Sequence, residues 1–255
     1  MAMNKYRDRI INLGKEAGAQ IVLPEMTDVR VREAARELIS MDFDILNIED
    51  FQDNLDIYLD FLNKLPFTDN WPADNLREFL NDPLHFAMAM VACDDADCLV
   101  AGAVNSSSEV IRSVIRMIGI RPTSNQVSSI FFMISPDGNS AFTFADCAVI
   151  PEPDSKQLAA IGAESAEFHH FLTGDEPLVA FLSFSTKGSA SHYRVDRVRD
   201  AVEIFGNKYP QIIHDGEVQV DAAIIPEVNK LKIPNSPING QANVLIFPNL
   251  DAGNI

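Results

Sequence analysis

Short apolar runs alternate with segments of helical periodicity along this chain, and this alternation restricts the fold more than any other feature of the sequence. The runs at 21–24, 177–184 and 243–248 have the length of strands. Two parallel strands need a long connection that crosses back over the sheet, and this connection is usually a helix. Strands that alternate with helices along a chain therefore indicate a parallel sheet. The run at 177–184 is apolar at nearly every position, as in a strand covered on both faces. The sequence therefore predicts an α/β fold with mostly parallel sheets.

The same patterns give the expected order of elements. The turn sequence Pro136–Asn139 joins two β-rich runs at 127–135 and 141–150, so one antiparallel hairpin is expected. Residues 50–80 are polar and irregular, with weak helical signals. We expect two lobes with a cleft between them. Helices are predicted at 4–17, after Asp28, and at 82–92, 155–172, 193–208 and 219–231, with further strands at 44–48, 97–104 and 212–214.

The chain is strongly acidic, with a formal net charge of −17. Such a surface repels nucleic acid and anionic lipid, so neither is an expected partner, although local donors can still bind a small anion. No apolar stretch approaches the ~18 residues of a membrane span, and the N-terminus lacks the apolar core of a secretory signal. Cys93, Cys98 and Cys147 fit neither a disulfide framework nor a zinc knuckle, so we expect reduced thiols, no metal site and a cytoplasmic location.

Three loops follow predicted strands, where ligands bind in open α/β sheets. The first loop runs from Ala101 to Arg112 and passes into a helix at Ser106–Ser108. Ser106 and Glu109 have the spacing of a capping box, and the free N–H groups of a helix start favour an anion. Arg112 lies further along the helix and can reach a phosphate with two hydrogen bonds. The alternative interpretation is an ordinary capped helix with a surface arginine.

The second loop, Leu182–Ala190, follows the most apolar strand. It lacks the glycine pattern of a Walker A loop, but its hydroxyls, lysine and glycine suit a phosphate or pyrophosphate. The alternative is a turn with a solvated lysine. The third loop, Phe247–Ile255, is expected to be a plain loop that contains a glycine. The polar residues of the second loop are Ser185, Thr186, Lys187, Gly188 and Ser189.

Other polar residues give weaker signals. Neither G-x-S-x-G nor H-E-x-x-H is present, and the adjacent His169 and His170 point in different directions on a helix, so they cannot share a metal ion. Asp146, Asp215 and Glu217 lie at strand ends or helix starts. They can either cap helices or face a cleft, and their spacing does not choose between the two.

Seven segments of the chain occur together in an order that is far more specific than any single loop. The segments are IVLPEMTDVRVREAA, DADCLVAGAVNSSSEVIRSVIRMIG, VSSIFFM, FADCAVIPEP, LSFSTKGSA, DGEVQVDAAIIPEV and SPINGQANVLIFPNLDAGNI. In this order they resemble the phosphate acetyltransferases, of the phosphate acetyl/butyryltransferase family. The resemblance covers residues 20–40 and is essentially continuous over residues 82–255.

The resemblance implies two α/β domains, each with a sheet between helical layers, of the isocitrate/isopropylmalate-dehydrogenase type, with the active site in the interdomain cleft. We place the domains at 1–125, without its C-terminal returning segment, and at 126–255. The implied reaction is the reversible transfer of an acetyl group between acetyl-CoA and phosphate, giving acetyl phosphate and CoA, as in acetate metabolism. Coenzyme A is a substrate, no metal or other cofactor takes part, and a homodimer is expected.

The resemblance also assigns residues to the site. Arg112 matches an arginine implicated in substrate binding and catalysis, and Arg30 matches a further arginine of the cleft. In the implied mechanism a base deprotonates the thiol of CoA, the thiolate attacks acetyl phosphate, and donors stabilise the oxyanion and the departing phosphate. The other residues implied to bind substrate are Ser106, Ser107, Ser108, Ser185, Thr186, Lys187, Gly188 and Asn254.

Two departures from the family pattern lead to an expectation about activity. Family members continue beyond the G-N-I motif with a D-L-S-R-G segment that carries a catalytic serine. They also have an R-K-x-x-G arginine that has no counterpart in Lys64–Asn75. We therefore expect an incomplete copy with weak or no turnover. A phosphate butyryltransferase and a non-catalytic, acyl-CoA-binding regulatory module stay open as alternatives.

Overall fold

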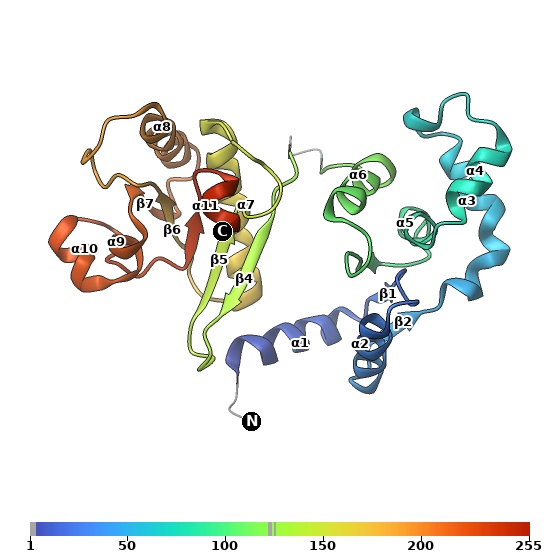
Figure 1. The fold of residues 1–255 in the computed structure, drawn as a ribbon. Coiled ribbons are helices and arrows are strands. Elements are labelled where there is room, and N and C mark those ends of the chain that lie inside the picture. The colour runs from blue at the N-terminus through green and yellow to red at the C-terminus, as the bar shows by residue number, and fades with distance from the viewer. Residues whose placement is uncertain (1–3, 122–123, 125) are drawn as a thin grey trace. The chain divides into compact units, whose positions relative to one another are not determined.

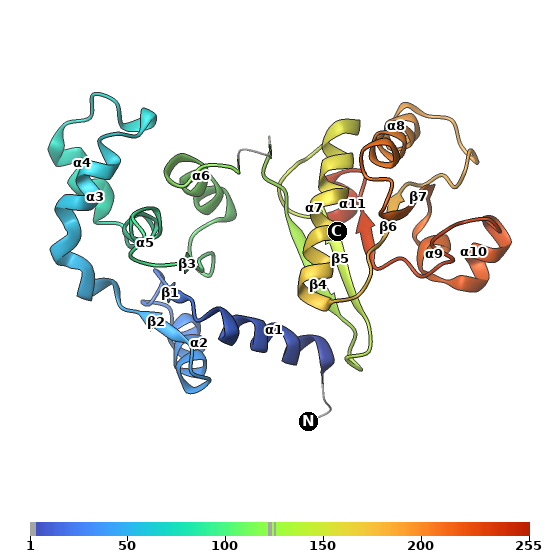
Figure 2. The same cartoon turned by 180° about the vertical axis from the view of Figure 1, so that it is seen from behind.

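The computed structural model describes residues 4–121, 124 and 126–255. The chain divides into two compact units, one of residues 11–125 and one that combines residues 1–10 with 126–255. Figure 1 labels the elements of both units, and Figure 2 shows them from behind. The expected domain boundary after residue 125 falls at a position outside the described residues. The first ten residues group with the later unit, whereas the range 1–125 places them with the earlier one.

Helix α1 (Lys5–Ala17) accounts for this grouping. The Tyr6 hydroxyl donates a 2.6 Å hydrogen bond to Asp175, and the Lys5 ammonium lies 3.2 Å from the same carboxylate. The Arg9 guanidinium donates to the backbone carbonyl of Leu172 at 3.0 Å. These contacts attach the first part of α1 to a segment that follows about 170 residues later in the chain.

The unit of residues 11–125 contains a parallel sheet in the order β2 (Asp44–Leu46), β1 (Gln20–Val22) and β3 (Cys98–Leu99). Its core joins Val22 to the apolar helix α5 (Pro83–Ala92), which is capped by Asp82 through the Leu84 N–H at 2.8 Å. The remaining elements are α2 (Val29–Ser40), η1 (Ile48–Asn54), α3 (Leu55–Leu62), η2 (Pro66–Thr68), α4 (Ala73–Leu80) and α6 (Ser107–Met117).

Two expectations for this unit need correction. Residues 50–80 contain the regular helices α3 and α4, because the apolar residues of these helices pack against α5 and so stabilise segments of weak intrinsic signal. The strand expected at 97–104 ends at Leu99. Beyond it the backbone N–H groups of 102–105 bind a side chain instead of a neighbouring strand.

The later unit contains a five-stranded sheet in the order β4–β5–β8–β6–β7. The pair β4–β5 is antiparallel and the other pairs are parallel, which confirms the predicted α/β fold with mostly parallel sheets and one hairpin. The elements are β4 (Ile130–Ile134), β5 (Ala141–Ala145), α7 (Ser155–Thr173), β6 (Leu178–Leu182), α8 (Tyr193–Lys208), β7 (Ile213–Val218), α9 (Val220–Ile224), α10 (Pro226–Lys232), β8 (Val244–Ile246) and α11 (Leu250–Asn254).

Strand β6 shows why this sheet has helices on both faces. Val179 and Phe181 pack with α7 and α8, whereas Ala180 and Leu182 pack on the other face with α9. Successive side chains of a strand point to opposite faces, so a strand covered twice must be apolar throughout. The uninterrupted apolar run in the sequence therefore predicted a buried strand correctly, and this unit has three layers.

Two further expectations differ from the structure in this unit. The helix expected at 219–231 is divided into α9 and α10 at Pro226, which lacks the N–H that a continuous helix requires. The third loop, expected to be plain, forms the short helix α11, which Asn249 caps by accepting from the Ala252 N–H at 3.0 Å. Within the described residues, no helix combines the length and the apolar character needed to cross a membrane.

Candidate functional site

The first predicted anion loop is wrapped around a carboxylate of the protein itself. Glu25, which follows β1 and is only 6% exposed, accepts hydrogen bonds from four successive backbone N–H groups. Its Oε2 accepts from Gly102 and Ala103 at 3.0 and 2.7 Å, and its Oε1 accepts from Val104 and Asn105 at 3.1 and 2.7 Å. The backbone donors of residues 102–105, just before the helix start, are therefore occupied by the protein itself.

Glu25 is ionised in this environment. Burial opposes its ionisation, but the four backbone donors outweigh that effect and lower the pKa of Glu25 below its ordinary value. Each carboxylate oxygen of Glu25 accepts two hydrogen bonds, and together these bonds fix the shape of the loop that leads into α6. The sequence pattern could not show this role, since Glu25 and its donors lie 77 to 80 residues apart.

The start of α6 has the predicted capping box. The Ser106 hydroxyl accepts from the Glu109 N–H at 3.3 Å, while Glu109 accepts from the Ser106 N–H at 2.9 Å. Arg30 joins this region from α2, because its guanidinium binds Asp28 and donates to the Ala103 carbonyl at 2.7 Å. Arg30 and the serines thus lie around one loop, with Ser107 and Ser108 exposed.

Arg112 lines a cavity of about 210 Å³ on the same helix. Arg116, one turn further on, lines it too, as do Asn105 and Ser113. Among the described residues, neither arginine forms an ion pair with a carboxylate, and both are exposed. The carboxylates of Asp82 and Glu109 line the same cavity, and the charge of Arg112 is one of the causes that lower the pKa of Glu109. A phosphate in this cavity would therefore meet groups of both signs, with the two guanidinium groups as its donors.

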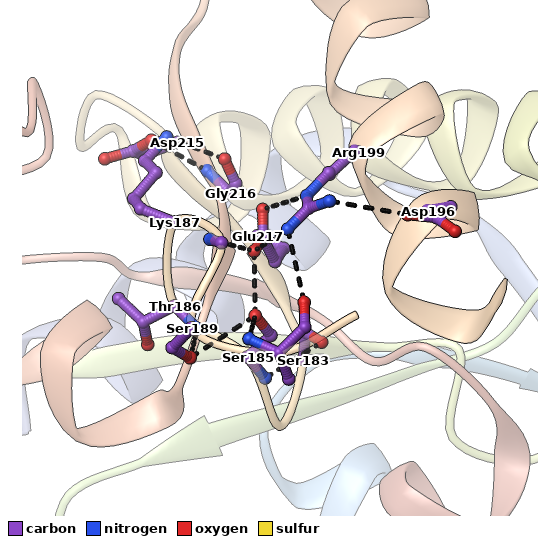
Figure 3. A network of polar contacts seen from close by, with 12 residues as sticks. Ser183, Ser185, Thr186, Lys187, Ser189, Asp196, Arg199, Asp215, Gly216 and Glu217 are labelled. Carbon is purple, nitrogen blue, oxygen red and sulfur yellow. Dashed lines mark hydrogen bonds and ion pairs between the residues drawn. The ribbon is translucent and has the colours of Figure 1, made fainter. Parts of the chain in front are cut away.

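A second buried carboxylate holds the second predicted anion loop (Figure 3). Glu217 of β7 is 2% exposed and accepts from the Ser185 hydroxyl at 2.9 Å and from the Gly188 N–H at 2.8 Å. Arg199 of α8 donates to both Glu217 oxygens at 3.1 Å. Burial raises the pKa of Glu217, but Arg199 and the loop donors outweigh that effect, and the net pKa is lowered. The loop is thus fixed from inside.

Lys187, expected to meet a phosphate, is also bound within the protein. Its ammonium forms an ion pair with the buried Asp215 and donates to the Gly216 carbonyl at 2.7 Å, as Figure 3 shows. Asp215 accepts a further hydrogen bond from the Ser236 hydroxyl. The Thr186 hydroxyl contacts the Gln219 side chain at 3.3 Å. The polar groups of this loop thus bind neighbouring residues of the same unit, and its lysine is ion-paired and not simply solvated.

The loop that follows β5 is also held by a buried carboxylate. Asp146, which follows β5 and is buried, accepts from the Ser129 hydroxyl and from the backbone N–H groups of 148, 149 and 150. Asn254 of α11 donates to the neighbouring Cys147 carbonyl at 2.7 Å. Asp146, Glu217 and Glu25 thus each bind a loop that follows a strand. For Asp146 and Glu217 the sequence alone did not decide between capping a helix and facing a cleft.

An apolar pocket of about 300 Å³ lies where the chain leaves β6 and β8, and the sequence analysis missed it. These strands are neighbours, yet the helix after β6 leads towards β7 while α11 turns towards β5. Such a divergence is where open α/β sheets bind ligands. The strand order reveals this point, and a single sequence does not give strand order. The pocket is lined by Leu182, Ser183, Phe184, Arg194, Val220, Phe247, Pro248, Asn249 and Ala252.

The predicted site residues fall into two groups, one in each unit. Arg30, Ser106–Ser108 and Arg112 belong to the unit of residues 11–125, and Ser185–Gly188 and Asn254 belong to the other. Over the described ranges, no group of three or more histidine, cysteine or acidic side chains is arranged to hold a metal ion.

Comparison with known proteins gives a consistent result. The family model described as "Phosphate acetyl/butaryl transferase" matches residues 40–255. The phosphate acetyltransferase of Acetivibrio thermocellus is 37% identical over 98% of this chain and 83% of its own length. That of Thermoanaerobacterium thermosaccharolyticum is 47% identical over 71% of this chain and 57% of its own length.

Solved structures agree with these relatives. The EutD phosphotransacetylase from Staphylococcus aureus aligns with a TM-score of 0.82 and 33% identity, over 99% of this chain and 85% of its own. A phosphotransacetylase from Streptococcus pyogenes aligns with a TM-score of 0.80 and 30% identity, over 98% and 82% of the two chains. The match of sequence and fold over nearly its whole length shows that this chain belongs to the phosphate acetyl/butaryl transferase family.

Proposed function

We propose that this chain is an acyltransferase that moves an acetyl group reversibly between acetyl-CoA and inorganic phosphate, giving CoA and acetyl phosphate. The observation that supports this most is the family match over residues 40–255, with relatives named phosphate acetyltransferase along nearly the whole chain. These names favour acetyl transfer over butyryl transfer and over a non-catalytic module.

The reaction requires a cation for the phosphate and donors for the oxyanion that forms on the acetyl carbonyl. We assign the first role to Arg112, because it is exposed and lines a cavity together with Arg116. The exposed hydroxyls of Ser107 and Ser108 at the start of α6 supply nearby donors. Arg30 acts through the loop, since it donates to the Ala103 carbonyl.

The residues of the later unit have a different proposed role. Ser185, Thr186, Lys187 and Gly188 are proposed to contact substrate from a loop whose shape is fixed by its internal bonds to Glu217, Gln219 and Asp215. Asn254 does the same for the loop after β5. We retain 1–125 and 126–255 as the proposed domains, and we also propose a cytoplasmic homodimer that uses CoA as a substrate without another cofactor.

Turnover and binding should be measured separately to test the function. Thioester formation from acetyl phosphate and CoA gives the rate, and calorimetry gives the affinities for CoA and phosphate. We expect both ligands to bind, and acetyl phosphate to be used in preference to butyryl phosphate. Absence of both binding and turnover would refute the function, whereas preference for butyryl phosphate would correct the acyl group. Sedimentation of the same sample tests the homodimer.

A further inference from the structure

A histidine lies in the cavity that Arg112 and Arg116 line, and the proposed function leaves this histidine without a role. His85 of α5 lines the cavity and is half-buried. Its ring stacks on the Phe79 ring of α4, with centroids 3.7 Å apart and planes 11° from parallel. The stack fixes the plane of the imidazole, so each of its two nitrogens has a defined neighbour.

The two nitrogens of His85 have partners of different kinds. Nδ1 lies 3.2 Å from the Phe79 carbonyl oxygen, which can only accept, so Nδ1 carries a hydrogen. Nε2 lies 3.2 Å from the Ser113 hydroxyl of α6, which can donate or accept. In neutral His85 the hydroxyl therefore donates to Nε2. In protonated His85 the bond reverses, because Nε2 then carries a hydrogen and donates to the hydroxyl oxygen.

The reversal of this bond changes what Ser113 offers to the cavity. Ser113 lines the same cavity and directly follows Arg112 in α6. While the hydroxyl donates to the imidazole, its one hydrogen is not available to a ligand. Once the imidazole is protonated, that hydrogen is released and can bond to an anion beside the guanidinium groups.

The other charges of the cavity balance, so protonation of His85 decides its sign. The two guanidinium groups of α6 share the lining with two carboxylates, those of Asp82 at the start of α5 and Glu109 of α6. The residues that α4 and the loop before α6 contribute to the described lining are uncharged. One proton on His85 therefore makes the lining positive. Histidine is the side chain whose charge ordinarily changes between pH 5 and 8.

We propose that His85 is a proton-linked positioning residue, which strengthens phosphate binding in this cavity when it is protonated. The inference rests on the proposed function, which places phosphate at Arg112. Protonated His85 adds a positive charge to the lining and frees the Ser113 hydroxyl to donate to the phosphate. Binding and protonation favour each other by linkage, so phosphate binds with uptake of a proton at His85.

Calorimetric titration of the intact chain with phosphate at pH 6 and pH 8 tests the inference. Phosphate itself changes charge over this range, so each variant is compared with the unsubstituted chain at the same pH. His85→Gln retains a donor for Ser113, and His85→Phe retains the stack on Phe79, but neither variant titrates. The affinity of each, relative to the unsubstituted chain, should fall about tenfold from pH 8 to pH 6. A purely structural defect would weaken binding equally at both pH values.

Two further variants complete the test. Ser113→Ala keeps the charge of His85 and removes the hydroxyl, so its relative affinity should show part of the same fall. His170→Gln is the matched control, since His170 is an exposed histidine on α7 that lines no part of this cavity. It should follow the unsubstituted chain at both pH values.

The outcomes separate the inference from the function on which it rests. If both His85 variants have the same relative affinity at pH 6 and pH 8, the inference is overturned while the acetyltransferase proposal stands. An equal fall in His170→Gln would overturn it as well. If Arg112→Ala binds phosphate as tightly as the unsubstituted chain, phosphate does not occupy this cavity, and the inference fails with the assignment of Arg112. If the unsubstituted chain binds no phosphate and shows no turnover, the proposed function fails first.

Discussion

Individual carboxylates decide the shape of the loops that follow the strands. Glu25, Asp146 and Glu217 are all buried, and each accepts from backbone N–H groups of a loop that leaves a sheet. A buried ionised group is tolerated only where such donors replace water. In the loop after β3 the result is a rigid approach to Ser106 and Arg112, although Glu25 itself need not contact a substrate.

Replacement of Glu25 by glutamine tests this role at a single residue. The amide nitrogen would face two of the four N–H donors, which would lose their acceptor, so we expect a loss of about 1–3 kcal/mol in unfolding free energy. Hydrogen exchange should become faster at the amides of 102–105 but not elsewhere in the unit. If the site proposal holds, KM for phosphate rises while KM for CoA changes little. Glu33→Gln, an exposed change on α2, is the control.

An unchanged exchange rate at these amides would contradict the role of Glu25 in the loop. Faster exchange with unaltered phosphate kinetics would instead show that the loop does not affect phosphate binding.

Prediction from sequence was weakest at the scale of single residues. Nothing near Glu25 in the chain marks its partners, because hydrogen bonds across 77 residues leave no local pattern.

At the scale of elements, α6 concentrates the proposed chemistry. Arg112→Ala should raise KM for phosphate and lower the rate at least tenfold, because a charge-assisted phosphate contact is lost. Arg116→Ala should have a smaller effect of the same sign, and the exposed Arg36→Ala on α2 should have none. Steady-state kinetics with phosphate and CoA varied in turn would show this. Equal activity of Arg112→Ala and the unsubstituted chain would remove Arg112 from the site.

The cap of the same helix gives an independent stability prediction. Ser106→Ala removes an acceptor for the Glu109 N–H, and we expect a loss of about 1 kcal/mol in urea unfolding. Ser107→Ala, which leaves the cap intact, should be nearly neutral. A neutral Ser106→Ala would mean that the loop bound to Glu25 alone holds the start of the helix.

Elements with strong periodicity were predicted well from sequence. The helices at 155–172 and 193–208 appear as α7 and α8, because a long amphipathic segment has one stable way to bury its apolar face. The prediction failed where tertiary contacts decide the outcome. Helices α3 and α4 depend on packing against α5. Strand β3 is short because the N–H groups of 102–105 donate to the Glu25 carboxylate and not to a neighbouring strand. The pocket beside Phe184 depends on strand order, which the local pattern does not give.

At the scale of the whole molecule, acid should destabilise the fold in two stages. Burial lowers the pKa of His169 to about 4 in the folded state. As the pH falls below about 6.5, His169 is therefore protonated in the unfolded state but not in the folded state, and the free energy of unfolding decreases. That stage costs on the order of 3 kcal/mol by pH 4. The ionised Glu25 and Glu217 stabilise the fold above about pH 4.3, and this contribution is lost as the pH falls through their lower pKa values.

Urea unfolding at pH 7, 5 and 4 would measure the first stage. His169→Phe should flatten the dependence between pH 6.5 and 4 and leave the later loss below pH 4.3 in place. A pH dependence unchanged by this substitution would show that His169 is not the group responsible. The hydroxyl of Thr143, 3.0 Å from the His169 ring, would lose its partner, so the comparison is between slopes and not absolute stabilities.

The bonds between α1 and Asp175 have a consequence for how the protein is made. Tyr6 and its acceptor are separated by 169 residues, so the acceptor does not yet exist when α1 leaves the ribosome. At roughly 5–20 residues per second, translation takes on the order of ten to thirty seconds to supply it. Residues 11–125 are synthesised within that interval and can reach their own packing first. During translation the Tyr6 hydroxyl therefore has no bond to Asp175 until the segment that contains Asp175 has been synthesised.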